Sequence, residues 1–206
     1  MKSNLKVKKI AYFLIGMIFL TLGIRIISLS NLGLAFSDAI LIKLNEMLKI
    51  PVALSSIALG IFVVVVANVI EKRRFFDRFE CIITSFVLGF FLDLWIAIIP
   101  TLYIKGFIFK ILTFLVGVFI LSVGVSIYLQ PKFPPHPNDL LLMTVSNNYN
   151  LSIFRAKIRI DSFFAIISIV MLAPIGLGSI FNTLCIGYFV NKLYSTFEKI
   201  YNKLVN

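Results

Sequence analysis

Six long stretches of this sequence are almost entirely apolar, and their length limits the fold more than any other feature. A helix needs about 20 apolar residues to cross the hydrocarbon core of a bilayer. The stretches lie at approximately 10–30, 53–70, 79–99, 107–129, 157–174 and 177–195. Of the 206 residues, 60% are hydrophobic and only 14% are charged, too few charges for the surface of a soluble domain. The sequence therefore predicts an all-α membrane protein with six transmembrane helices, in which residues 1–206 form a single integral membrane domain.

The basic residues predict how these helices cross the bilayer. The net charge is +11, but the Lys and Arg residues gather at the ends of the apolar runs, which argues against nucleic acid as a partner. Lys and Arg favour the cytoplasmic side of a membrane. With the N-terminus inside, 15 of the 20 basic residues fall on the cytoplasmic side and 5 outside. We expect a multi-pass protein of the cell membrane with both termini in the cytoplasm and the lipid bilayer as its first partner.

The two halves of the chain resemble each other at an offset of about 101 residues. The stretch GMIFLTLGI (16–24) aligns with GVFILSVGV (117–125), and FSDAIL (36–41) aligns with PNDLLL (137–142). Each half holds three spans, and because three is odd the halves must cross the membrane in opposite directions. The pattern predicts a 3+3 inverted-topology repeat, an architecture of many transporters, with repeat 1 at about 10–99 and repeat 2 at about 107–197.

Glycines recur at aligned positions of the two halves. Small residues let helices approach closely inside a membrane. The glycines predicted to serve helix packing are Gly16, Gly23, Gly89, Gly117, Gly124, Gly176, Gly178 and Gly187.

A polar, helix-breaking segment follows the first span of each half. Asp38 in the first and Asp139 in the second stand where a helix begins, since an acid in the first turn favours the positive end of the helix dipole. The apolar runs after them are too short to span. The segments 31–50 and 131–150 therefore predict short helices that are either re-entrant and line a cavity, or lie at the interface.

Three polar residues inside the predicted spans are further candidates for a substrate or ion pathway, because such residues are costly in a membrane. Arg25 and Asp93 share a depth on the outer side and are predicted to form an ion pair or a substrate-facing pair; alternatively, Arg25 extends to the outer headgroups. Asn182 either contributes to packing between helices or marks a substrate site.

Three short motifs resemble the YczE/YyaS/YitT group of bacterial integral membrane proteins, and its YczE-like branch most closely. The first, LG-x-x-P-W-D, keeps Gly33 and Asp38 but has Phe-Ser in place of Pro-Trp. The second, G-P-x-D-G-L, keeps Pro137 and Asp139 and loses a glycine. The third, G-x-G-T-x-x-N-x-x-x-x-G, keeps Gly176, Gly178, Asn182 and Gly187, with Ser179 for Thr. The resemblance implies a multi-spanning bacterial membrane protein and no particular activity.

These observations favour a small secondary transporter or exporter of an unidentified small molecule or ion. The alternative is a non-transporting scaffold or assembly partner of a membrane-associated enzyme or export system. A third reading, the substrate-binding subunit of a vitamin importer, fits the size but not the internal repeat. The sequence has none of the common catalytic or metal-binding motifs, so we expect no enzyme, no cofactor and no metal site. It leaves open a homo-oligomer or a membrane-protein partner.

Overall fold

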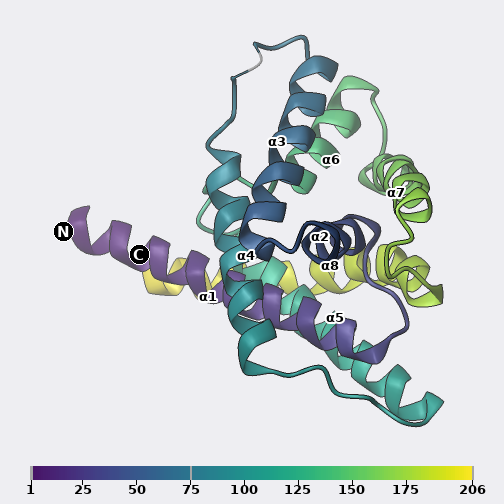
Figure 1. Ribbon diagram of the computed structural model, residues 1–206. Coiled ribbons are helices and arrows are strands. Elements are labelled where there is room, and N and C mark those ends of the chain that lie inside the picture. The colour runs from purple at the N-terminus through teal and green to yellow at the C-terminus, as the bar shows by residue number, and fades with distance from the viewer. Residues whose placement is uncertain (1, 75, 206) are drawn as a thin grey trace.

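The computed structural model describes residues 2–74 and 76–205, and every regular element in this part of the chain is a helix (Figure 1). The helices are α1 (Lys2–Ser30), α2 (Phe36–Leu48), α3 (Val52–Ile70), α4 (Cys81–Ile98), α5 (Phe107–Tyr128), α6 (Pro137–Asn148), α7 (Ile153–Val170) and α8 (Leu177–Val205). The two short helices, α2 and α6, occupy the positions predicted after the first and fourth apolar stretches.

Four of these helices are long and apolar enough to cross a membrane: α1 from Leu5 to Ser30, α3, α4 and α5. The prediction of an α-helical membrane protein is confirmed. The last two predicted spans correspond to α7 and α8, which are less apolar. The first half of α7 carries Arg155, Lys157, Arg159 and Asp161, and α8 carries Asn182, Asn191 and Lys192.

Helix ends agree closely with the predicted spans in the middle of the chain and differ near its end. α3, α4 and α5 end within two residues of the prediction. α7 begins four residues earlier than predicted because the Ser152 hydroxyl accepts the Arg155 N–H at 3.4 Å and caps the helix. α8 continues to Val205, where its extension packs on α1 with the rings of Tyr201 and Tyr12 5.1 Å apart.

The antiparallel pair of α1 and α5 is held at very short range by glycines. A Cβ at Gly16 would lie 2.4 Å from the backbone nitrogen of Tyr128, and one at Gly23 would lie 2.4 Å from that of Leu121. From the other side, a Cβ at Gly117 would lie 2.8 Å from the backbone nitrogen of Ile27, and one at Gly124 2.2 Å from that of Leu20. The two backbones therefore touch at four places where no side chain fits.

The other predicted packing glycines have different surroundings. A Cβ at Gly89 on α4 would lie 2.4 Å from Cα of Ala53 on α3. One at Gly176 or Gly178 would meet the Leu32 carbonyl oxygen at 2.4 and 2.8 Å. Gly187 has no atom within 4 Å of its would-be Cβ, so it faces open space.

The two short helices lie between the longer ones rather than apart from them. α2 packs against α3 and α7, and α6 packs against the same two helices (Figure 1). Ile40 of α2 and Leu140, Leu141 and Val145 of α6 share one apolar cluster with residues of α3 and α7, among them Val64 and Phe164. Each short helix therefore buries its apolar face in the interior of the bundle.

The two ends of the chain lie side by side at the left of Figure 1. Lys8 Nζ donates to the Leu204 carbonyl oxygen at 2.8 Å, and the Tyr12 hydroxyl donates to the Phe197 carbonyl oxygen at 3.2 Å. The beginning of α1 and the end of α8 are therefore in direct contact.

The glycine contacts predict a clear contrast between two substitutions. Gly124→Ala should lower the free energy of unfolding by about 1–3 kcal/mol, because its methyl group would overlap the backbone of Leu20. Gly187→Ala should be neutral or stabilising by up to about 1 kcal/mol, since alanine favours a helix and meets open space. Unfolding of the purified protein in mixed detergent micelles measures both; equal midpoints for the two variants would contradict the close α1–α5 contact.

Candidate functional site

The first turns of α2 and α6 meet in the middle of the molecule and build a polar site. The residues that precede them, Ala35 and His136, have nearly the same extended backbone, with φ and ψ of −55° and 144° and of −59° and 144°. Asp38 is the third residue of α2, and Asp139 is the third residue of α6. Both acids thus lie in the first turn, at the positive end of a helix dipole.

A small cavity separates these two helix starts. It is lined by Ser37 and Asp38 of α2, by Ser56 and Gly60 of α3, and by the segment 136–138 with its neighbours Leu41, Leu59 and Leu88. Its volume of about 10 Å³ suits roughly one water molecule. The Asn138 side-chain oxygen is buried and has no hydrogen-bond partner in the described part of the chain. The cavity is therefore narrow, mostly apolar with a few polar groups, and shared by both halves of the sequence.

Charged groups surround this cavity on several sides. The Tyr128 hydroxyl donates a hydrogen bond to Asp139 Oδ2. On α7, Lys157 Nζ pairs with Asp161 Oδ2 at 3.0 Å. Burial raises the pKa of Asp38 to about 7; the charge of Lys157 opposes the rise, and those of Asp161 and Asp139 add to it. α2 is too short to cross a membrane, and its acid can gain and lose a proton near neutral pH.

His136 serves as the cap of α6 in its neutral form. Its Nδ1 accepts the Asn138 N–H at 3.4 Å, which requires that this nitrogen carry no proton. Burial lowers the pKa of His136, and the nearby Asp139 only partly opposes this shift. His136 thus lines the central cavity together with Pro137 and Asn138.

The segment after α1 crosses the segment before α8 with backbone hydrogen bonds. The Leu34 N–H donates to the Pro174 carbonyl at 3.2 Å, and the Gly178 N–H donates to the Leu32 carbonyl at 2.8 Å. Gly33 lies at the crossing with a φ of +112°, and a Cβ there would be 2.4 Å from the Gly176 nitrogen. Only glycine suits both this conformation and this closeness.

Asn182 lies one turn beyond this crossing, on α8. Its side chain is fully buried, and neither its nitrogen nor its oxygen has a hydrogen-bond partner among the described residues. A buried amide usually has partners, so the contacts of Asn182 are incomplete in this conformation. The geometry does not show it joining two helices through a hydrogen bond.

The predicted ion pair of Arg25 and Asp93 is wrong, because the structure gives each residue other partners. The Arg25 guanidinium donates from Nε and Nη2 to the Ile99 carbonyl at 3.2 and 2.7 Å. The two Asp93 oxygens accept the N–H groups of Val52 and Ala53 at 2.8 and 2.9 Å. Asp93 thus caps the start of α3. The first N–H groups of a helix need acceptors from outside the helix, and the sequence does not reveal that Asp93 supplies them here.

Arg25 instead lines a cavity with a volume of about 390 Å³. The cavity lies between the end of α1, the middle of α2 and the segments 99–102 and 174–175. Arg25 is only 7% exposed, whereas Glu46 at the same cavity is exposed. This cavity shares no lining residue with the small central one; the central cavity lies at the start of α2 and this cavity toward its end.

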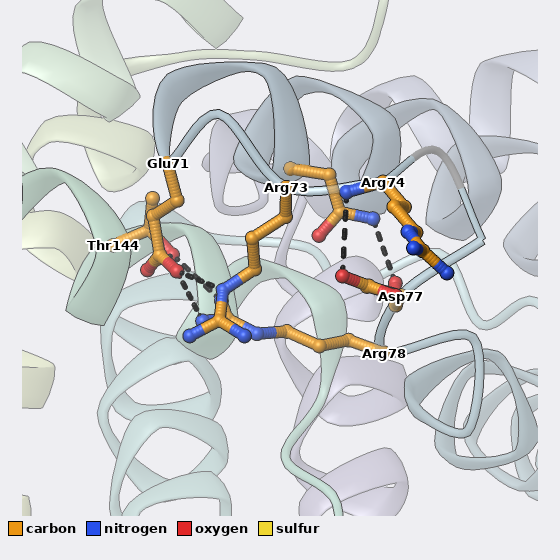
Figure 2. A network of polar contacts seen from close by, with 7 residues as sticks. Glu71, Arg73, Arg74, Asp77, Arg78 and Thr144 are labelled. Carbon is orange, nitrogen blue, oxygen red and sulfur yellow. Dashed lines mark hydrogen bonds and ion pairs between the residues drawn. The ribbon is translucent and has the colours of Figure 1, made fainter.

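A third polar group ties the loop after α3 to α6, and Figure 2 shows it from close by. Glu71 accepts from Arg73 Nε at 2.6 Å, from the Arg78 guanidinium, and from the Thr144 hydroxyl at 2.9 Å. Arg78 also donates to Thr144 at 3.2 Å. Burial alone would raise the pKa of Glu71, but the hydrogen bonds from Arg73, Arg78 and Thr144 outweigh it and lower this pKa overall.

Comparison with known proteins shows the family to which the chain belongs. Residues 7–195 match a family of unknown function, DUF6198. The chain belongs to this family. It is also similar to the uncharacterized protein YyaS of Bacillus subtilis (strain 168), with 27% identity over 180 residues, 87% of this chain and 88% of the relative. The resemblance to YyaS-type proteins is thus confirmed, and no solved structure matches the chain.

The three sequence motifs that resemble the family contact one another in the fold. Gly33 of the first motif abuts Gly176 of the third, and Asp38 of the first shares the central cavity with Pro137 of the second. Segments up to about 140 residues apart in the chain are therefore assembled around α2.

The sequence did not reveal the Glu71 network or the bond between Tyr128 and Asp139. In the sequence, Glu71 directly follows the second apolar stretch, and Thr144 lies in the short apolar run after Asp139. Only the approach of α6 to the end of α3 brings these groups together. The one available hint was the density of opposite charges in the stretch 71–78, EKRRFFDR.

The Glu71 network predicts a specific sensitivity to acid. A carboxyl group whose pKa is lowered by folding stabilises the protein above its unfolded pKa, and this contribution disappears as the pH falls through the folded pKa. We expect the unfolding midpoint of the native protein to fall as the pH drops below about 4.3, the pKa of glutamate in the unfolded chain. Glu71→Gln should be less stable at pH 7 and show a smaller fall. The exposed Glu80→Gln is the matched control; a Glu71→Gln profile parallel to that of the native protein would contradict the assignment.

Proposed function

We propose that the protein is a small secondary transporter or exporter of the bacterial cell membrane, built as an inverted repeat of two three-helix units. The observation that carries the proposal is the meeting of α2 and α6 at a shared small cavity, each with an acid in the third position of the helix. Transporters with inverted repeats bind substrate and coupling ions where broken or short helices meet between the two halves.

The contacts between α1 and α5 fit the two-fold relation that the alignment implies. Gly16 meets Tyr128, and Gly117 meets Ile27. If each residue of the first pair is moved to the aligned position in the other half, the second pair results. The same operation converts the pair of Gly23 and Leu121 into the pair of Gly124 and Leu20. Such reciprocal contacts are what a two-fold axis between the repeats requires.

The arrangement of the short helices obeys the same operation. α2 packs on α3 and α7, and its counterpart α6 packs on α7 and α3. In this proposal α7 and α8 are the fifth and sixth spans, despite their polar residues. Asn182 is fully buried, and the Lys157–Asp161 pair is half-buried. Buried polar groups of this kind are tolerated in transporter helices.

The contact between the two chain ends supports the proposed topology. Six crossings return the chain to the side on which it began. The bond from Lys8 to Leu204 and the contact of Tyr12 with Tyr201 are compatible with both termini in the cytoplasm. The basic residues of the termini and of the loop 71–80 then face the cytoplasm together.

Asp38 and Asp139 have the role of coupling groups in this proposal. Asp38 lies close enough to Lys157, Asp161 and Asp139 for their charges to act on it. A proton taken up at Asp38 would therefore change the balance of charge between α2, α6 and α7. Because these helices belong to different repeats, this charge can favour one relative arrangement of the halves over the other.

Transport by the purified protein in proteoliposomes tests the proposal. We expect at least one solute of a broad panel to move faster in protein-containing vesicles when a proton gradient is applied. Asp38→Asn should reduce this gradient-driven flux about tenfold, because asparagine cannot take up or release the coupling proton. A tenfold change corresponds to about 1.4 kcal/mol. Glu198→Gln, which removes an exposed carboxylate at the far end of α8, is the matched control and should retain the flux.

Equal leak from vesicles with and without the protein, across the whole panel and in both gradient directions, would count against a transporter. Co-purification with a membrane-bound enzyme or export system under those conditions would favour the alternative scaffold function.

A further inference from the structure

We propose that the 390 Å³ cavity beside Arg25 binds a small, water-soluble carboxylate with an apolar tail. This inference rests on the proposed transport function, in which the ligand would be the transported solute. The evidence for binding comes from the cavity itself. It assigns a ligand class to a site distinct from the acidic centre at Asp38.

The Arg25 guanidinium is a buried cation without a counter-ion. It is 7% exposed, and no carboxylate in the described residues lies within ion-pair distance of it. Its partners are the Ile99 carbonyl and, at 3.5 Å, the Thr101 hydroxyl. An arginine stays charged at any physiological pH and offers five N–H donors. Burial of such a charge without an anion is costly, so an anion at this site would stabilise it.

Packing alone does not explain an arginine at this position. The aligned residue of the second repeat is Ser126, whose hydroxyl bonds within its own helix to the Ser122 carbonyl at 2.8 Å. The α1–α5 interface thus accepts a small residue at the equivalent place. The positive charge of Arg25 is therefore present only in the first repeat, next to the 390 Å³ cavity.

The lining of the cavity indicates the rest of the ligand. Polar residues of the wall include Ser28, Asn31, Asn45 and Thr101 besides Arg25, and apolar side chains such as Ile27, Ile42 and Ile96 form about half of the wall. A volume of about 390 Å³ falls at the lower end of the range for ligand pockets, about 300–1,000 Å³. Glu46 is the acid of this cavity, and because it is exposed, water screens its repulsion of an anion. One buried positive charge and a wall that is about half apolar suit a monoanion with a short hydrocarbon chain.

Butyrate and its uncharged isostere butyramide provide the direct test, with binding to the purified protein in phosphatidylcholine nanodiscs measured by calorimetry. We expect butyrate to bind at least about tenfold more tightly than butyramide, because only the carboxylate pairs with the guanidinium. Arg25→Gln should abolish this preference. Arg25→Lys should keep part of it, since the charge remains. Lys105→Gln removes an exposed charge from the same side of the protein, outside the cavity lining, and should leave the preference unchanged.

A second measurement leaves Arg25 in place, in case its substitutions unfold the protein. Leu102 lines the cavity and is 54% exposed, so a cysteine there is open to maleimide. Butyrate should slow the labelling of Leu102→Cys, relative to the parent protein, and butyramide should not. Equal effects of the two compounds in both measurements would overturn the proposal.

The lipid headgroup is the other source of an anion, and the nanodiscs distinguish it. If phosphatidylglycerol in the nanodisc protects Leu102→Cys without butyrate, the site binds lipid and the proposed soluble carboxylate is wrong. Because binding needs no gradient, failure to bind butyrate leaves the transport result untouched. Binding without any flux in proteoliposomes would retain the site and remove the transport function.

Discussion

The structure depends on the approach of the α1 and α5 backbones to each other. Within a bilayer the hydrophobic effect does not drive helices together, so close van der Waals packing must hold them. Gly16, Gly23, Gly117 and Gly124 provide it at four places where even a methyl group would overlap the partner backbone. This pair forms the scaffold on which the remaining helices are arranged. It also fixes where the polar segments after α1 and α5 begin, and hence where α2 and α6 can meet.

The two halves use this common scaffold differently. In the first, Asp93 caps α3 and Gly89 brings α4 against it, so that α3 and α4 form a tight pair. In the second, α7 carries the Lys157–Asp161 pair toward the acidic centre and makes few contacts with α8. Arg25 is likewise present in one half only. In our proposal a duplicated frame supplies symmetry, and different residues at a few aligned positions supply charges that are not symmetric. In our proposal these charges are the ones that handle protons and substrate.

Much of the architecture could be predicted from the sequence because it depends on local properties. Apolar length gave the helices α3, α4 and α5 to within two residues, and the acids at 38 and 139 correctly marked two short helices. What failed was pairing in space. The sequence predicts a similar depth for Arg25 and Asp93, yet each bonds to backbone groups freed at a helix end. A sequence does not show which free N–H or carbonyl lies nearby. The Glu71–Thr144 contact was hidden for the same reason, since it joins residues 73 positions apart.

The sidedness of the chain in intact cells tests the inverted repeat most directly. Single cysteines replacing Met47 and Lys105, with Cys81 and Cys185 changed to serine, should react with an impermeant maleimide from outside. Cysteines replacing Lys72 and Lys203 should react only after the membrane is permeabilised, and a cysteine placed before α1 should behave like the one at position 203. Reaction of the two chain ends from opposite sides would contradict an even number of crossings, and with it the two-fold relation between the halves.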